Sequence, residues 1–417
     1  MAKAKNKKPV AACPFSDKEI INYANKSQRS LKFCMVNAYT SRSCSRYEET
    51  HRVLSRSLSM AITEEERHHL LNSITNTALE IMHAGVYNWL KIFGGDYILY
   101  GSMTDFDLEY YDILYINYNS LNYELPYLIR QRIGWNSKTK IILTPDYPVE
   151  DIINYDLKAN PMETMRQIEF VDLVMCTNEV TYDLFKSLCG GNKVQYVEHP
   201  TDVVGLRQLL LDGKTKIDEK LLSCSVNPET GSTMPVLLIN THKRNRGKDG
   251  IPDIYSPYVA VGMGEQRLPY LTYISNIPGD KMDLVAPLFG TFTLPDDIPI
   301  KKFWDFMIRS FAAVDFYTSS SYGRFTTETG ALGVPTVCSK HTDSGRKIFP
   351  ELAVDMRYPS QIHEKLKNLL FDLSFRNHVI EVASKNVEQY DYPTSKKKFL
   401  RMCREAELFP SSDIYLG

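Results

Sequence analysis

Residues 314–339 combine chemical groups that suit a phosphate-bearing ligand. An apolar run, Val314 to Tyr317, is followed by a polar loop, by a short helix that carries Glu328, and by a second apolar run from Val334. Unpaired backbone N–H groups at the start of a helix attract phosphate, and a carboxylate one turn into that helix can accept hydrogen bonds from ribose hydroxyls. The pattern predicts a site for a phosphorylated ligand at a sheet edge. An ordinary buried loop and helix of a doubly wound domain is the alternative.

A basic segment between Asn240 and Lys248 forms a second group. It follows an apolar run, Leu237 to Ile239, and contains one histidine, two lysines and two arginines. Cationic groups at the carboxyl end of a strand lie where doubly wound sheets bind ligands. Guanidinium and ammonium groups there would neutralise the negative charge of a phosphate-bearing ligand. The alternative is a basic turn exposed to solvent.

The elements that must position these groups alternate along the chain, because short apolar runs predict strands and apolar residues at helical spacing predict helices. In the first half we expect strands at 31–37, 97–100, 112–117, 139–144, 171–176 and 193–197, and helices at 46–57, 63–92, 125–133, 162–170 and 179–188. In the second half we expect strands at 235–240, 284–289, 313–317 and 334–338, and helices at 300–311, 361–373, 375–385 and 395–407. Thr63 and Glu66 have capping-box spacing. The alternation predicts an α/β fold with doubly wound parallel sheets.

A length of 417 residues predicts two domains. The expected order is an N-terminal tail at 1–30, a first Rossmann-like domain at 31–204, an interdomain connection at 205–233, a second Rossmann-like domain at 234–385 and a C-terminal helix at 386–417.

Net charge and cysteine usage restrict the classes of partner. The formal net charge is -1 at pH 7, so no overall electrostatic attraction to nucleic acid or membrane is expected. We expect neither a membrane span nor a secretory signal, because no run of 18 apolar residues occurs and the Lys-rich start has no apolar segment behind it. The eight cysteines form no zinc pattern, and Cys34, Cys176 and Cys338 lie in apolar runs. A cytoplasmic location is expected, and no oligomeric state is signalled.

Residues 322–335 resemble the donor-site signature of GT-B glycosyltransferases, especially the large retaining group that uses nucleotide sugars. That signature has an aromatic–Gly pair followed by Glu-x-x-Ala-x-Gly-x-Pro. Tyr322-Gly323 and the residues from Glu328 to Pro335 match it in order and spacing. The resemblance implies two Rossmann-like domains that face each other across a cleft, the first for the acceptor and the second for the nucleotide sugar. It also implies that the C-terminal helix returns toward the first domain.

The resemblance also places the donor-site residues. Asn240 occupies the position where relatives have an Arg, and Arg246-Gly247 the position of their Lys-Gly pair. Ser320 departs from the pattern, since relatives often have a second Glu there. Arg246 and Glu328 are implied to take part in catalysis. The implied donor-binding residues are Asn240, Lys243, Arg244, Arg246, Gly247, Tyr322, Gly323, Arg324, Phe325, Thr326, Thr327 and Glu328.

Two segments of the first domain are expected on the acceptor side. The first is a polar loop in which relatives carry a Gly-Gly pair; its side chains are Ser41, Arg42, Ser43, Ser45 and Arg46. Its alternative is a surface loop with a helix cap. The second is Asp146, which matches the Asp of a His-Asp pair in relatives, whereas Pro145 replaces the His. Asp146 would orient an acceptor hydroxyl or take its proton, or else cap the turn before Pro148.

The implied reaction moves a sugar from a UDP- or GDP-linked donor to an acceptor hydroxyl with retention. In this group the protein supplies positioning and charge stabilisation, without an obligate nucleophile. Neither a metal nor a cofactor is expected. Asp105-Phe106-Asp107 has the spelling of a metal-binding motif, but it lies in an acidic stretch and we interpret it as a coincidence.

The sequence leaves more than one acceptor and more than one activity open. A glycan or lipid-linked saccharide is the acceptor expected first. A hydroxymethylated base of DNA is the second, because phage DNA glucosyltransferases share the GT-B fold and Ser45-Arg46-Tyr47 is loosely similar to the start of their first helix. A non-catalytic nucleotide-sugar-binding module is the third, since Ser320, Pro145 and the missing Gly-Gly pair permit a degenerate site. A nucleotide-sugar epimerase is the fourth.

Overall fold

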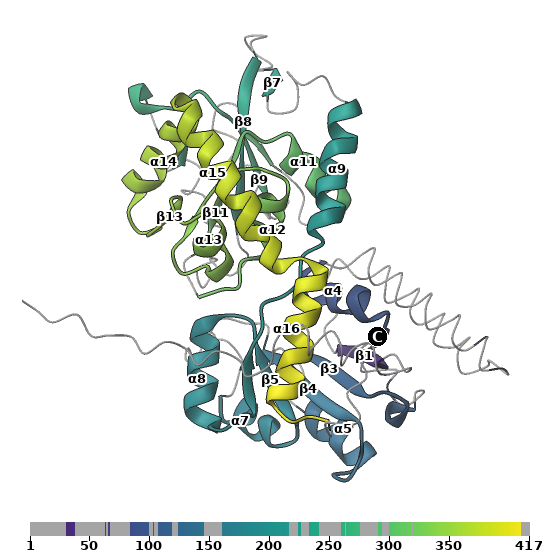
Figure 1. Ribbon diagram of the computed structural model, residues 1–417. Helices are drawn as coiled ribbons and strands as arrows, with labels where there is room; N and C mark the ends of the chain where they lie inside the picture. The colour runs from purple at the N-terminus through teal and green to yellow at the C-terminus, as the bar shows by residue number, and fades with distance from the viewer. Residues whose placement is uncertain are drawn as a thin grey trace, which may run out of the picture.

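The structure is a computed structural model that describes residues 31–37, 63, 66, 84–99, 103, 107–118, 124–145, 161–216, 224–226, 233–241, 260–262, 264–275, 291–293, 300–317 and 320–409. These residues form two α/β domains, one above the other in Figure 1, each built around a β-sheet.

The sheet of the first domain has six parallel strands in the order β2-β1-β3-β4-β5-β6. The strands are β1 (Phe33–Asn37), β2 (Asp96–Leu99), β3 (Ile113–Tyr118), β4 (Lys140–Pro145), β5 (Leu173–Cys176) and β6 (Val194–Tyr196). Each is a short, largely apolar run because both faces of the sheet are covered. The strand order reverses between β1 and β3, which pair directly, and doubly wound sheets bind ligands at such a point.

Helices cover both faces of this sheet. They are α4 (Ala84–Phe93), α5 (Leu125–Ile133), α7 (Pro161–Glu169) and α8 (Glu179–Cys189). Ile129, Ile168 and Phe185, from α5, α7 and α8, pack on one face of the sheet. Trp89 of α4 packs in a separate cluster on the other face.

The sheet of the second domain follows the order β10-β9-β8-β11-β12-β13, with all neighbours parallel. The strands are β8 (Thr233–Thr241), β9 (Leu271–Ser275), β10 (Thr291–Thr293), β11 (Ala312–Phe316), β12 (Thr336–Ser339) and β13 (Ala353–Val354). A short strand, β7 (Cys224–Val226), pairs antiparallel with the start of β8. Numbered from β8, this is the 3-2-1-4-5-6 order of dinucleotide-binding domains, with its switch point between β8 and β11.

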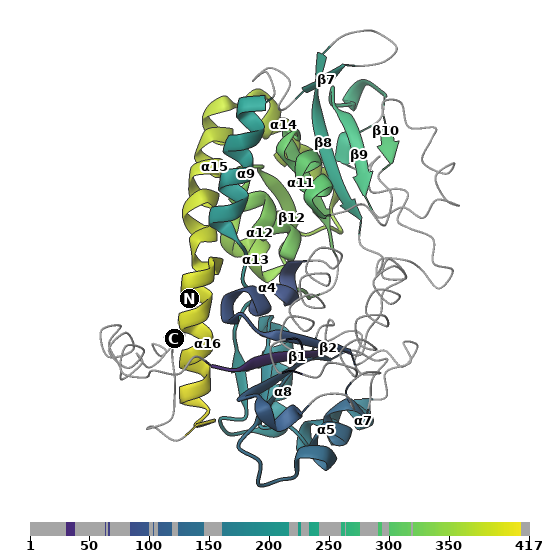
Figure 2. The same ribbon diagram turned by 90° about the vertical axis from the view of Figure 1, so that its right-hand side faces the viewer.

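The helices of the second domain enclose a single large hydrophobic core. They are α9 (Val203–Lys216), α11 (Ile300–Ile308), α12 (Arg324–Ala331), α13 (Asp343–Ile348), α14 (Pro359–Phe371) and α15 (Leu373–Asn386). Figure 2 shows α9 and α15 side by side along one flank of this domain. Leu206 of α9 and Ala383 of α15 both belong to its core.

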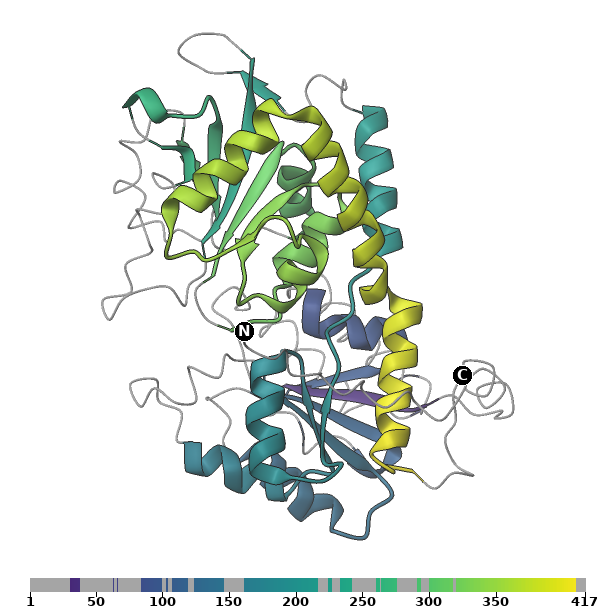
Figure 3. The ribbon, with the colours of Figure 1, turned by 60° about the vertical axis from the view of Figure 1, so that its left-hand side comes forward.

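After α15 the chain crosses to the first domain through a short turn, η8 (Val387–Tyr390), and continues as α16 (Tyr392–Glu405). Figure 3 shows this crossing, with α16 running along the first domain. Phe399 of α16 is fully buried among aromatic rings of the first domain, with ring centroids 4.9 Å from Trp89, 5.0 Å from Phe93 and 6.1 Å from Phe33. The helix therefore completes the core of the first domain.

The expected α/β class with doubly wound parallel sheets is confirmed. The expected capping box is also present, since Thr63 and Glu66 exchange backbone-to-side-chain hydrogen bonds of 3.1 Å in both directions. Strand β9 was not predicted. The strand expected at 284–289 and the helix expected at 46–57 lie outside the described residues. The segment expected as an interdomain connection, 205–233, contains most of α9, which packs on the second domain.

Candidate functional site

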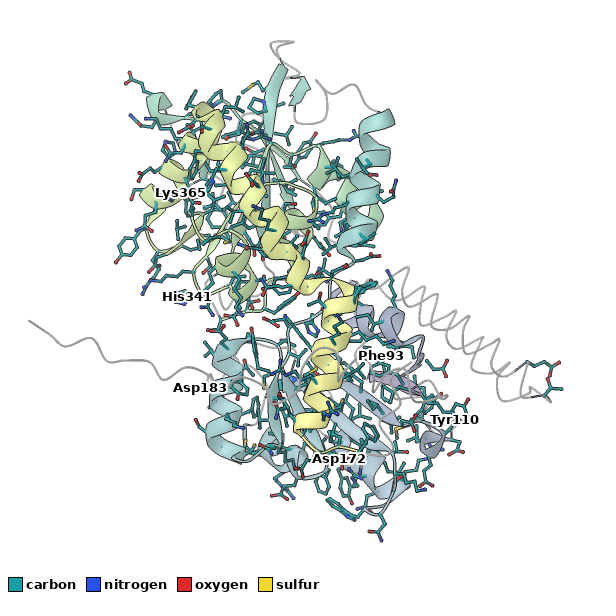
Figure 4. All side chains as sticks on the ribbon, viewed as in Figure 1. Phe93, Tyr110, Asp172, Asp183, His341 and Lys365 are labelled. Atoms are coloured by element: carbon teal, nitrogen blue, oxygen red, sulfur yellow. The ribbon has the colours of Figure 1, made fainter. Side chains whose placement is uncertain are left out.

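The carboxyl edges of the two sheets face each other. Glu179, which starts α8 just after β5, donates its backbone N–H to Oδ2 of Asp343, which starts α13 just after β12 (2.6 Å). In Figure 4 the labelled His341 lies at the edge of the second domain that faces the first, and Asp183 lies on α8 across from it. The ligand-binding edges that doubly wound sheets share are thus brought together.

At the switch point of the second domain, two polar side chains meet in the interior. Asn240 near the end of β8 and Asp315 near the end of β11 are paired in the sheet, and Asn240 Nδ2 donates to Asp315 Oδ1 at 2.9 Å. Asp315 is only 1% exposed. The sequence-based prediction included Asn240 but missed Asp315, whose one signal is a charged residue inside the apolar run 312–316.

Gly323 shapes the turn that leads into α12. Its φ of +86° lies in the left-handed region, and a Cβ built on it would overlap the Thr342 side chain. Its carbonyl oxygen accepts hydrogen bonds from Thr326 Oγ1 (2.7 Å) and Ser344 Oγ (2.6 Å). The start of α12 therefore has a fixed position over the end of β11, as a helix N-terminus that binds phosphate requires.

Glu328 lies one turn into α12 and is 3% exposed. Burial raises the pKa of its carboxyl group, and the Arg324 guanidinium, whose Nε is 3.5 Å from Oε1, opposes this rise. The Arg324 side chain is 32% exposed. A carboxyl group beside a partly exposed guanidinium, on one face of a helix start, can hold the ribose hydroxyls and phosphates of a nucleotide.

Other residues expected to bind the donor have internal partners. Tyr322 donates its hydroxyl to the carbonyl of His199 at 2.5 Å and packs edge-on against the His199 ring. Thr327 Oγ1 accepts from Thr201 Oγ1 at 2.7 Å. Both bonds tie the start of α12 to residues 199–201, where the chain passes between the domains. Phe325 belongs to the hydrophobic core of the second domain.

The structure thus gathers Asn240 and the predicted residues 322–328 at one sheet edge. The remaining predicted residues lie outside the described residues: Ser41, Arg42, Ser43, Ser45, Arg46, Asp146, Lys243, Arg244, Arg246 and Gly247. Asp343 and the loop after β12 were not singled out from the sequence.

Within the described residues, no group of three or more His, Cys, Asp or Glu side chains could hold a metal ion. Asp107, from the Asp-x-Asp spelling, caps a short helical turn by accepting from the backbone N–H of Glu109 at 3.1 Å. None of the helices in the described part of the chain is long and apolar enough to cross a bilayer.

No model of a protein family matches this sequence, and a comparison with curated proteins finds no match. Solved structures are similar along nearly the whole chain. Sucrose-phosphate synthase from Thermosynechococcus elongatus matches with a TM-score of 0.53 and 10% identity, over 90% of this chain and 99% of that one. Trehalose 6-phosphate synthase from Burkholderia multivorans gives 0.54 and 10%, over 90% and 97%. A glycosyltransferase from Rickettsia africae gives 0.54 and 10%, over 91% and 100%.

These structures have the GT-B fold, so the expected GT-B architecture is confirmed for this chain. The matches cover both domains and almost all of the other chains. At 10% identity it establishes the fold, whereas function must be argued from the site.

Proposed function

We propose that this protein is a glycosyltransferase that moves a sugar from a nucleotide sugar to an acceptor hydroxyl. The observation that carries the proposal is Glu328, buried one turn into a helix whose start is fixed at the switch point of the second domain. This position combines backbone N–H donors for phosphate with a carboxyl group one turn further along the helix. The GT-B fold supports the same assignment.

In the proposed reaction the second domain holds the leaving nucleoside diphosphate. The N-terminus of α12 and the Arg324 guanidinium stabilise the charge that develops on the phosphates, and Glu328 fixes the ribose. Among the basic residues after β8, Arg246 is proposed to add the main positive charge. Asp146 of the first domain is proposed to orient the acceptor. We also propose retention of the anomeric configuration, because the donor-site signature resembles the retaining group.

For the acceptor we propose a glycan or lipid-linked saccharide. Because trehalose-phosphate synthases are among the similar structures, one of them in complex with glucose 6-phosphate, sugar phosphates belong in the same acceptor panel. We propose a cytoplasmic location, because Cys34, Cys176 and Cys338 are buried as core residues and are not paired in disulfides.

The test starts with a thermal-shift screen of nucleoside diphosphates and nucleotide sugars, followed by an assay for nucleoside diphosphate release with each acceptor. Glu328→Ala is expected to weaken nucleotide binding by about 1–3 kcal/mol. Glu351→Ala is the matched control, since Glu351 is an exposed carboxylate of the same domain that pairs with His378 at 2.8 Å. Equal affinity of wild type and Glu328→Ala would remove the ribose role, and a folded wild type that binds no nucleotide would contradict the proposal.

A non-catalytic nucleotide-sugar-binding module is the second candidate. The observation in its favour is that Asn240 stands where relatives have an Arg and gives its amide to Asp315. Ser320, buried at the position of a second Glu in relatives, points the same way. Nucleotide binding without turnover on any acceptor in the panel would favour this candidate over the transferase.

A further inference from the structure

The carboxylate of Asp343 joins the two domains. Its Oδ2 accepts the backbone N–H of Glu179, the first residue of α8, at 2.6 Å. Asp343 is 3% exposed although it lies between domains. A carboxylate at a helix start normally comes from the residue that precedes the helix. In α8 the preceding residue, Asn178, does cap the helix by accepting the N–H of Thr181 at 2.8 Å. Asp343 of the second domain accepts a further N–H at this helix start, that of Glu179, so one bond of the α8 start depends on where the second domain lies.

Charged side chains from both domains and from α16 surround this contact. Arg346 lies between Glu179 Oε2 (2.5 Å) and Asp343 Oδ1 (2.9 Å). Lys347 contacts Glu179 Oε1 (3.0 Å) and Glu198 Oε1 (3.1 Å). Lys398 of α16 contacts the other oxygen of Glu198 at 3.0 Å. We call these six residues, three acidic and three basic, the interdomain network.

Burial raises the pKa of Asp343, while Arg346 and the N–H of Glu179 oppose that rise. The other two carboxylates respond in the opposite sense: the pKa values of Glu179 and Glu198 are lowered by Arg346, Lys347 and Lys398, despite burial that acts to raise them. Asp343 is therefore the acidic member whose charge is held least firmly by its neighbours.

The backbone around Asp343 is also bonded to the loop that precedes α12. Asp343 N–H donates to the carbonyl of Ser321 (2.9 Å), and Ser344 N–H donates to that of Tyr322 (3.0 Å). Ser321 N–H in turn donates to the carbonyl of His341 (3.2 Å). Ser344 Oγ reaches the carbonyl of Gly323. One short segment thus contacts the first domain through a side chain and the donor loop, residues 320–323, through its backbone.

We infer that Asp343 is a positioning residue that couples the orientation of the first domain to the shape of the donor loop. If α8 moves relative to the second domain, either the hydrogen bond from Glu179 N–H to Asp343 breaks or segment 341–344 moves with α8. Because the donor loop is hydrogen-bonded to that segment, the loop would then move as well. Occupation of the nucleotide site would then favour one domain orientation, because coupling between two sites is reciprocal. Only this nucleotide step rests on the proposed function.

The experiment compares Asp343→Ala with Asp343→Asn, which keeps a hydrogen-bond acceptor, and with a matched control. The control is Asp372→Ala, which removes an N-cap that accepts from Phe375 N–H (2.9 Å) within the second domain. Backbone hydrogen exchange by mass spectrometry reports on residues 179–185 and 320–328. Asp343→Ala should speed exchange in both segments, Asp343→Asn should restore much of the protection, and Asp372→Ala should leave both unchanged. Faster exchange at α8 with an unchanged donor loop would overturn the inference.

Binding of UDP and of GDP is measured on the same proteins. For whichever nucleotide wild type binds, Asp343→Ala should lower the affinity by at least about fivefold. Asp372→Ala should leave that affinity unchanged. If wild type binds neither nucleotide, the proposed function loses its support while the exchange data still decide the coupling. Should Asp343→Ala fail to fold, Arg346→Gln takes its place, since it removes the guanidinium that joins Glu179 and Asp343.

Discussion

Two polar pairs lie at opposite edges of their respective sheets, one at the amino ends of the strands and one at the carboxyl ends. In the first domain, Arg130 donates from Nη2 to Asp172 Oδ2 at 2.7 Å and from Nε to the carbonyl of Phe170 at 2.9 Å. The same oxygen of Asp172 accepts the N–H of Ile141 at 2.7 Å. This pair lies at the amino ends of β4 and β5, and Figure 4 shows Asp172 at the part of the first domain that is remote from the second. In the second domain, Asn240 and Asp315 lie at the carboxyl ends of β8 and β11.

Both pairs contain a carboxylate and a largely buried partner, although the Asp172 side chain is 24% exposed and Asp315 is 1% exposed. The two pairs lie at different edges of their sheets. The bonds of Arg130 go to loop carbonyls that join helices to strands, so it fastens the non-binding edge of the sheet. Asn240 and Asp315 sit at the edge where doubly wound sheets bind ligands. We therefore expect similar chemistry to serve stability at one sheet edge and the site at the other, and one substitution in each pair separates these roles.

The largest effect is expected for Arg130→Ala. Removing the guanidinium, which is 3% exposed, breaks its bonds to Asp172 and to the carbonyls of Phe170 and Gly134, and should lower the free energy of unfolding by about 3 kcal/mol. Nucleotide affinity of the folded fraction should equal that of wild type. Urea unfolding followed by fluorescence measures the first quantity and titration calorimetry the second; weaker nucleotide binding would refute the division of roles.

Asn240→Ala should have a smaller effect on stability and a clear effect on binding. The change removes one hydrogen bond from the buried Asp315 carboxylate, which should cost about 1–2 kcal/mol of unfolding free energy. Because Asn240 leads into the basic segment after β8, nucleotide binding should also weaken. Urea unfolding and titration calorimetry measure the two effects. An unchanged nucleotide affinity would show that Asn240 and Asp315, like Arg130 and Asp172, contribute to stability alone.

The smallest effect concerns the pH dependence of Glu328. Burial raises its pKa in the folded state, so the unfolded state loses the proton first as pH rises. Wild type should therefore lose stability relative to Glu328→Gln from about pH 4.3, the ordinary value for Glu, up to the folded-state pKa, with no further change above it. The slope of the difference cannot exceed about 1.4 kcal/mol per pH unit. Unfolding curves of both proteins between pH 4 and 7.5 measure it, and parallel curves would show that the pKa is not raised.

Much of the fold could be predicted from the sequence, because apolar runs and their spacing reflect burial on a covered parallel sheet. The helix expected at 125–133 has the bounds observed for α5. Strand β9, Leu271–Ser275, was missed because the run is short and Thr272 interrupts its apolar pattern, although Thr272 is buried between β10 and β8.

The site could be predicted only where a motif carried it. The Glu-x-x-Ala-x-Gly-x-Pro spacing led to Glu328 on α12. Asp315 and Asp343 acquire their roles from tertiary contacts, since the partner of Asp315 is 75 residues away and that of Asp343 is 164 residues away. Strand order and domain packing determine those contacts, and local sequence patterns do not predict them.

The passage of α16 onto the first domain has a consequence for how the chain is made. Phe399, Met402 and Cys403 fill the face of the first sheet that also holds Phe33 and Trp89. During synthesis, residues 31–198 leave the ribosome before Phe399, Met402 and Cys403 have been added to the chain. The apolar face around Phe33 and Trp89 therefore stays uncovered while the second domain is translated. The core of the earlier-made domain is therefore completed by a helix that emerges only after the second domain.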